Sequence, residues 1–187
     1  DVYKRQQHYA FVVNAFVSLL KRADMTRYEL FLRETRTYEI IEDVKNFRSE
    51  IGVLFLNGYN RDVLTKMFDD NRLTYTSLFK ARPHIFVSKS NPLAKHKVVS
   101  LEDLEDFPYL SYDQGIHNSF YYSEEILSQI PHKKSIVVSD RATLFNLLIG
   151  LDGYTIATGI LNSNLNGDNI VSIPLDVDDE IDIVYLK

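Results

Sequence analysis

Short polar and charged side chains recur where strand-like segments of this sequence pass into helix-like segments. These residues are Gln6, Gln7 and His8; Thr35, Arg36 and Thr37; Asn57 and Gly58; Ser111; Ser139, Asp140 and Arg141; and Thr158. A helix N-terminus carries free N–H groups and a partial positive charge, so turns of this kind readily bind carboxylates and other anions. The pattern therefore indicates a binding site for a small molecule, assembled from several separate turns.

Several members of this set also have a structural interpretation. Thr35 and Thr37 either cap a helix, the commonest use of threonine at such a position, or contact a ligand. Asp140 is expected to cap a helix rather than to contact a ligand. Arg36 and Arg141 would favour an anionic ligand through bidentate pairing, although arginine is more often a solvated surface residue.

His8 and Ser111 are the two positions with the most chemical interest. His8 either begins the first helix or places a titratable ring in the site. Ser111 is the stronger candidate for ligand contact, because a hydroxyl between Leu110 and Tyr112 at a strand end is unusual in a core.

Catalytic and metal-binding motifs are missing. The sequence has no Gly-x-Ser-x-Gly, no Gly-x-x-x-x-Gly-Lys and no His-Glu-x-x-His. Its histidines lack ligand-like spacing, and zero cysteines exclude disulfides and thiolate ligands. We therefore expect no enzyme activity, no metal site and no cofactor.

The composition is that of a globular protein, with 187 residues, 45% of them hydrophobic and 25% charged. A net charge of −5 and the lack of a Lys/Arg run argue against direct nucleic-acid binding. No apolar run is long enough to span a bilayer and no secretory signal is visible. We expect a cytoplasmic protein without membrane contact, and a fragment, since the first residue is not Met; residues 1–6 need not be native.

Helical and strand patterns alternate along the chain. We expect strands at 2–7, 28–33, 51–56, 73–80, 84–89, 109–112, 134–139, 154–160, 170–174 and 181–186. Helices are expected at 8–21, 35–48, 61–68, 100–103, 117–130 and 142–149, and a turn-rich loop at 162–169. This order is typical of an α/β protein with parallel sheets and helices on both faces. The first helix is apolar almost all round, so it is either buried or shared with a partner subunit.

Three segments, in this order, resemble the effector-binding domain of LysR-type transcriptional regulators. Residues 83–94 are similar to the family's strand leading into His-Pro-Leu-Ala, with Asn91 in place of the histidine. Residues 98–110 resemble its Ser-Leu-x-Asp-Leu helix and following strand. Residues 147–157 resemble its Val-x-x-Gly-x-Gly-Ile-Ala turn, with one extra residue between the glycines.

The resemblance covers nearly the whole chain and implies the type 2 periplasmic-binding-protein fold. That fold is α/β, with two Rossmann-like lobes joined by two crossover segments and an effector in the cleft between them. Lobe I would comprise residues 1–82 and 173–187, and lobe II residues 83–172. The resemblance identifies Thr37 and Ser111 as the most probable effector contacts. The winged helix-turn-helix that would bind DNA is absent from this chain.

By this interpretation the protein is an effector-sensing regulatory domain. A small molecule, anionic if the two arginines contact it, would favour one arrangement of the lobes. The helices at 9–20 and 117–130 would form the interface of a homodimer or higher oligomer, with Tyr121 and Tyr122 as packing or interface residues. DNA would be contacted only through the missing N-terminal domain.

Three alternatives remain open. A solute-binding protein of the same fold would need export from the cytoplasm. An enzyme on this fold, such as a dehydratase acting on a carboxylated ring, would need an acid or base of shifted pKa, for which His8 is the only candidate. An interaction domain would have a dry, collapsed cleft.

Overall fold

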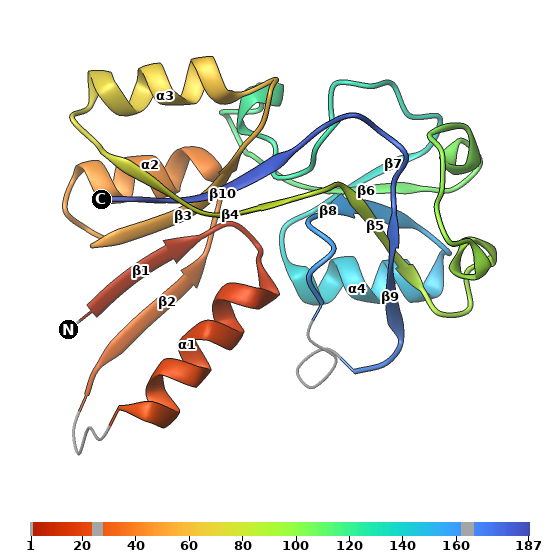
Figure 1. Cartoon of the computed structure of the whole chain (residues 1–187), viewed down its shortest axis with the longest axis horizontal. Coiled ribbons are helices and arrows are strands. Elements are labelled where there is room, and N and C mark those ends of the chain that lie inside the picture. The colour runs from red at the N-terminus through yellow and green to blue at the C-terminus, as the bar shows by residue number, and fades with distance from the viewer. Residues whose placement is uncertain (1, 24–27, 162–166) are drawn as a thin grey trace.

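Two five-stranded sheets, one in each half of the molecule, organise the chain (Figure 1). The computed structural model describes residues 2–23, 28–161 and 167–187. The first sheet has the order β2-β1-β3-β10-β4 and contains β1 (Val2–Gln6), β2 (Leu30–Glu34), β3 (Ile51–Leu56), β4 (Tyr75–Ala81) and β10 (Ile181–Leu186). The second has the order β7-β6-β8-β5-β9 and contains β5 (His84–Ser88), β6 (Tyr109–Tyr112), β7 (Ser135–Val138), β8 (Tyr154–Ala157) and β9 (Ile170–Pro174).

Helices cover these sheets. The α-helices are α1 (Ala10–Arg22), α2 (Thr37–Lys45), α3 (Arg61–Asp70) and α4 (Arg141–Gly150). Three short 3₁₀ helices lie between β5 and β7: η1 (Pro92–Lys95), η2 (Glu102–Leu104) and η3 (Phe120–Tyr122). None of the helices in the described part of the chain is long and apolar enough to cross a membrane.

Strand β3 is buried on both faces, as its continuous apolar run predicts. Leu54 and Leu56 pack in one cluster with residues of α2 and α3. Val53 and Phe55 point the other way, into a cluster that includes side chains at the start of α1. Because successive side chains of a strand face opposite sides, β3 joins the two helical layers of the first half.

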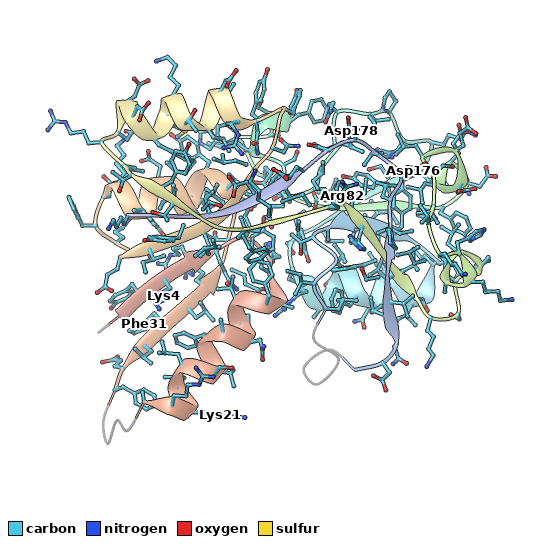
Figure 2. All side chains as sticks on the ribbon, viewed as in Figure 1. Lys4, Lys21, Phe31, Arg82, Asp176 and Asp178 are labelled. Atoms are coloured by element: carbon cyan, nitrogen blue, oxygen red, sulfur yellow. The ribbon has the colours of Figure 1, made fainter. Side chains whose placement is uncertain are left out.

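The backbone passes between the halves twice. One passage joins β4 to β5, and the other joins β9 to β10; Figure 2 marks Arg82 on the first and Asp176 and Asp178 on the second. The backbone N–H of Leu175 donates to the Pro83 carbonyl oxygen at 3.0 Å, so the two passages are hydrogen-bonded to each other. We propose the division into lobe I (1–82 and 173–187) and lobe II (83–172). Because Ile173 and Pro174 still pair with β5 in the second sheet, the strand pairing favours a second boundary just after Pro174.

The prediction of parallel sheets is wrong for part of each sheet. The three strands β2, β1 and β3 are parallel, and β6 is parallel to β7 and β8. Strand β10 is antiparallel to β3 and β4, and β5 is antiparallel to β8 and β9. These antiparallel strands flank the passages between the halves, where the chain enters and leaves each sheet without a helical crossover.

The helix predicted at 117–130 is also wrong. This segment contains only η3, followed by turns and irregular backbone. Leu127 has a φ of 60°, which an α-helix does not allow. Glu124 and Glu125 are buried and bonded to other parts of the chain, and these contacts replace the helix. The loop expected at 162–169 lies mostly outside the described residues.

Gly52 offers a test of the packing between β3 and α2. A Cβ added there would lie 2.5 Å from Ile40 Cγ2 and 3.0 Å from Val44 Cγ2, both on buried side chains. Gly52→Ala should therefore lower the free energy of unfolding by about 1–3 kcal/mol, measured by urea denaturation. Gly150→Ala is the matched control, since its Cβ meets nothing within 4 Å. Equal stability of the two variants would contradict this packing.

Candidate functional site

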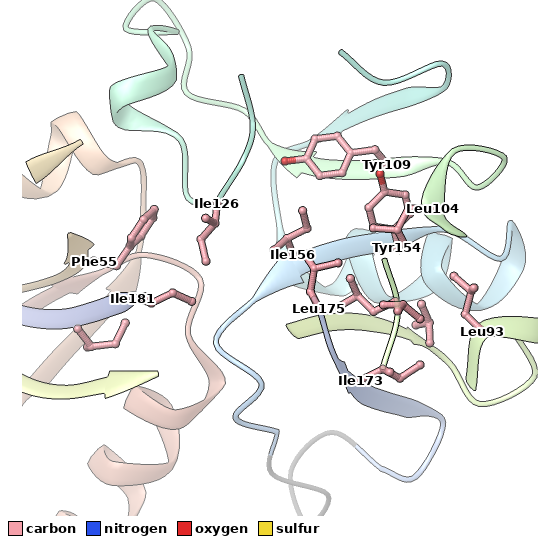
Figure 3. Packing of buried hydrophobic residues seen from close by; sticks show 14 of the residues in the cluster. Phe55, Leu93, Leu104, Tyr109, Ile126, Tyr154, Ile156, Ile173, Leu175 and Ile181 are labelled. Atoms are coloured by element: carbon pink, nitrogen blue, oxygen red, sulfur yellow. The ribbon is translucent and has the colours of Figure 1, made fainter. Parts of the chain in front are cut away.

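A narrow cavity of about 50 Å³, partly open to solvent, lies between the two halves. The first half contributes His8, Tyr9, Ala10, Phe11, Phe55 and Ile181. The second contributes Phe86, Tyr112, Glu124, Glu125, Ile126, Arg141, Leu144, Phe145, Thr155, Ile156, Ala157, Thr158 and Ile160. Figure 3 shows Ile126 beside Phe55 and Ile181, with Ile156 opposite. The walls are mainly apolar, with a few polar groups among them.

An ion pair between His8 and Glu124 closes one side of this cavity. The His8 backbone N–H donates to Glu124 Oε2 at 2.9 Å, and His8 Nδ1 lies 2.9 Å from the same oxygen. Gln114 Nε2 donates to Glu124 Oε1 at 3.1 Å. The His8 ring stacks on Tyr112 with the ring centroids 4.0 Å apart. His8 follows β1, whereas its partners belong to the second half, so this cluster fastens the halves together.

The environment of His8 favours its protonated form. Burial by itself lowers the pKa of His8, but the hydrogen bond and charge of Glu124 and the charge of Glu34 outweigh it, and the pKa is raised above its usual value. The side chains of His8 and Glu124 are only 7% and 3% exposed, so water screens the pair weakly. The pair is therefore a desolvated contact between the halves.

Glu125, the next residue, has a shifted pKa of its own. Burial raises its pKa well above the usual range, and the neighbouring charge of Glu124 raises it further. The Tyr112 backbone N–H donates to Glu125 Oε1 at 2.8 Å, which opposes this rise without cancelling it. The surroundings of Glu125 therefore favour the neutral form of its carboxyl group at the cavity wall.

The second cation at the cavity wall, Arg141, is paired as well. It is the first residue of α4, and its Nη2 lies 3.0 Å from Oε1 of Glu34, at the end of β2. Gln6 Nε2 donates to the same oxygen at 3.3 Å. This contact is a second link between the halves.

The start of α2 is also held by the second half. The backbone N–H of Thr37 donates to Gln114 Oε1 at 3.1 Å, and Thr37 Oγ1 accepts a hydrogen bond from Gln7 Nε2 at 2.5 Å. Arg36 donates to Asp113 through Nη2 at 2.5 Å and through Nε to the carbonyl oxygen at 3.2 Å. The first N–H group of α2 is therefore bonded by the chain itself.

The predicted site residues separate into three groups. His8, Arg141 and Thr158 line the cavity. Gln6, Gln7 and Thr37 are buried in the hydrogen-bond network behind it, and Arg36 spans the halves. The remaining six are not among the lining residues: Thr35, Asn57, Gly58, Ser111, Ser139 and Asp140.

Most of these six positions have an evident local role. Asp140 caps α4, as expected, by accepting from the Thr143 backbone N–H at 2.8 Å; Ser139 lies exposed before it. Asn57 accepts from two backbone N–H groups of its own turn and donates to Asp179 at 2.9 Å, and Gly58 lies exposed in that turn.

Thr35, Thr37 and Ser111 are the remaining hydroxyl-bearing candidates outside the cavity lining. Neither threonine caps α2: the residue before the helix is Arg36, Thr35 donates to Glu39, and the Thr37 hydroxyl accepts from Gln7. Ser111 lines a separate surface depression on the second half. A ligand role for these residues stays a prediction.

Sequence reasoning missed Glu124, Glu125, Gln114 and Tyr112, which build one wall. Three of them lie in or beside the segment that was predicted to be a helix. The signal present in the sequence is an acidic pair followed directly by apolar Ile126 and Leu127. Charged residues are almost never fully buried unless they are paired, so this acidic pair is a weak indication of a buried partner.

Comparison with known proteins identifies the family. The family model of the LysR substrate binding domain matches residues 2–185, and the chain therefore belongs to that family. Among solved structures, the effector binding domain of QuiR in complex with shikimate has 18% identity and a TM-score of 0.63 over 99% of this chain and 85% of that one. The BenM effector binding domain with its effector benzoate has 19% identity and a TM-score of 0.64, covering 99% and 81%.

Another solved structure is matched over only part of its length. HinK, a LysR family transcriptional regulator from Pseudomonas aeruginosa, has 13% identity and a TM-score of 0.62 over 99% of this chain. The chain spans 62% of that regulator's length. A search of curated protein sequences found no match. The fold is thus the two-lobed α/β fold that the resemblance implied.

The two adjacent glutamates predict opposite effects of the same substitution. Glu125→Gln replaces a neutral acid by a neutral amide and should leave the unfolding free energy unchanged or higher above neutral pH, because the folded state no longer holds a proton against solution. Glu124→Gln, the matched control, removes the partner of a buried charge and should cost roughly 1–3 kcal/mol. Chemical denaturation of both variants measures this; a larger loss in Glu125→Gln would contradict the assigned protonation states.

His8 predicts a pH dependence with a definite sign. Because its folded-state pKa is raised, its stabilisation is fully present below the unfolded pKa of about 6.5 and is lost as pH rises through the folded pKa. The stability advantage of the unaltered protein over His8→Gln should therefore shrink as pH rises. An NMR titration of the ring provides the direct measurement. In Glu124→Gln the same titration should move to lower pH, and an unmoved midpoint would be evidence against the pair.

Proposed function

We propose that this chain is the effector-sensing domain of a LysR-type transcriptional regulator and that a small molecule binds in the cavity between its lobes. The observation that carries this proposal is the cavity itself, with residues of both lobes in its walls. Two solved relatives of the same fold carry small molecules, shikimate in QuiR and benzoate in BenM. The domain would act in the cytoplasm, without a membrane partner and without catalysis.

The contacts between the lobes suggest how binding is transmitted. A ligand changes the arrangement of the lobes only as far as it binds one arrangement more tightly than another. His8–Glu124 and Glu34–Arg141 lie directly at the cavity, so a ligand that strengthens or weakens them shifts this equilibrium. In this proposal the shift reaches DNA through a separate DNA-binding domain, since this segment carries a net charge of −5.

We further propose that the domain associates with a second copy through α1. Only Ala10 of this helix is fully buried, although the sequence of the helix is predominantly apolar. Leu19 is 50% exposed on its outer side. The helix at 117–130, the other expected half of this interface, does not exist, so α1 would meet a surface of different shape.

Leu19→Glu tests this association. A charge on the shared face of α1 should weaken self-association at least about tenfold, seen by sedimentation equilibrium. Leu151→Glu is the control, because Leu151 has a similar exposure of 48% and lies in the other lobe after α4. A monomeric unaltered protein at high concentration, or equal effects of the two substitutions, would disprove the α1 interface.

Ligand binding itself is tested by thermal shift against a metabolite collection. A ligand present at about 100 times its dissociation constant should stabilise the domain by about 2.7 kcal/mol. Ala157→Leu, which fills the cavity, should abolish the shift. Ala142→Leu adds the same atoms on the exposed side of α4 and should retain it. A shift that survives in Ala157→Leu would locate the ligand elsewhere.

A further inference from the structure

Each cationic side chain that the structure describes in the walls of the cavity is paired with a carboxylate of the protein. In the part of the chain that the structure describes, His8 and Arg141 are the cationic side chains in its walls. His8 is held by Glu124 at 2.9 Å, and Arg141 is held by Glu34 at 3.0 Å. Each cation therefore already has a carboxylate partner from the opposite lobe.

Glu124 occupies the place that a ligand carboxylate would otherwise take. It receives the backbone N–H and ring of His8 and the side-chain amide of Gln114, the kinds of donor that recognise a carboxylate. A second carboxylate would meet its negative charge at close range in an apolar surrounding. Removing an anion from water without a partner is strongly unfavourable.

The remaining walls of the cavity suit the uncharged, apolar part of a ligand. Its walls include Phe11, Phe55, Phe86 and Phe145, which offer aromatic and apolar contact. Neutral polar side chains also lie among them, Thr155 and Thr158 included. The Thr158 hydroxyl accepts from the Ile160 backbone N–H at 3.4 Å, so its own O–H is left to donate to a ligand oxygen, and Glu125 presents a carboxyl group.

From this arrangement we infer that the effector is an uncharged, largely apolar molecule, aromatic or alicyclic, with a carbonyl, amide or hydroxyl group, and that Glu124 excludes carboxylates. This inference rests on the proposed function. It differs from the expectation of an anionic effector, which rested on bidentate pairing by Arg36 and Arg141. It also separates this chain from BenM and QuiR, whose structures carry benzoate and shikimate.

Matched pairs of neutral and anionic probes provide the test. Benzamide and benzoate, phenylacetamide and phenylacetate, and nicotinamide and nicotinate differ within each pair mainly in charge. Their dissociation constants for the unaltered chain are measured by NMR titration, with the methyl signals of Ile126, Ile156 and Ile181 reporting the cavity. The amide of each pair should bind at least about tenfold more tightly than its carboxylate.

The variant Glu124→Gln separates exclusion by charge from exclusion by shape. The amide keeps the size of the side chain and removes the negative charge that would repel a carboxylate, so carboxylate affinity should rise at least about tenfold while amide affinity changes little. The comparison in the unaltered protein stands even if this variant is too unstable to use. Glu39→Gln, on the exposed face of α2, is a control in which neither affinity should change.

The outcomes are distinct. Carboxylates that bind the unaltered protein as tightly as their amides overturn the inference about charge and leave the proposed function standing. Unchanged carboxylate affinity in Glu124→Gln overturns the role of Glu124. If no probe of either charge perturbs the cavity signals, both the inference and the proposed ligand site are overturned.

Discussion

The contact between His8 and Glu124 is the interaction on which the arrangement of the two lobes depends. The covalent chain joins the lobes through two extended passages, and side-chain contacts between the lobes set their relative orientation. The ion pair adds a desolvated contact between residues 116 positions apart, supported by Gln114 and by stacking on Tyr112. Because a buried charge without its partner is costly, the two lobes must keep these groups together or expose both to water.

The same contact determines the chemistry of the cavity. Glu124 is hydrogen-bonded to His8 and Gln114, and its charge raises the pKa of the adjacent Glu125. With Arg141 paired to Glu34, the cavity contains balanced charges and apolar walls. Like charges in a surrounding of low polarity cannot both persist at close range. The selectivity of the site therefore depends on groups that belong to the protein itself.

Segment 113–126 can form one wall of the cavity because its backbone is irregular rather than helical. A helix there would distribute its side chains around an axis, with its backbone groups bonded internally. Instead, Asp113, Gln114 and Glu124 reach the first lobe, and Glu125 turns to the backbone of β6. The polar groups at the start of α2 and before α1 obtain their partners from this segment, which satisfies donors that would otherwise be buried without acceptors.

The sequence by itself determined the elements that rest on local pattern: the buried strand β3, the helix α3, the cap of α4 by Asp140, and the late strands β9 and β10. Local periodicity and capping encode these, because they depend on neighbouring residues. Family motifs extended this to the two-lobed fold. Only the tertiary structure decided the direction of β5 and β10, the loss of the 117–130 helix and the pairing of His8 with Glu124. These features depend on partners far apart in the chain, and no local sequence pattern encodes such contacts. The 117–130 segment has a helical composition, but buried ionic contacts stabilised its irregular form more than helix formation would have.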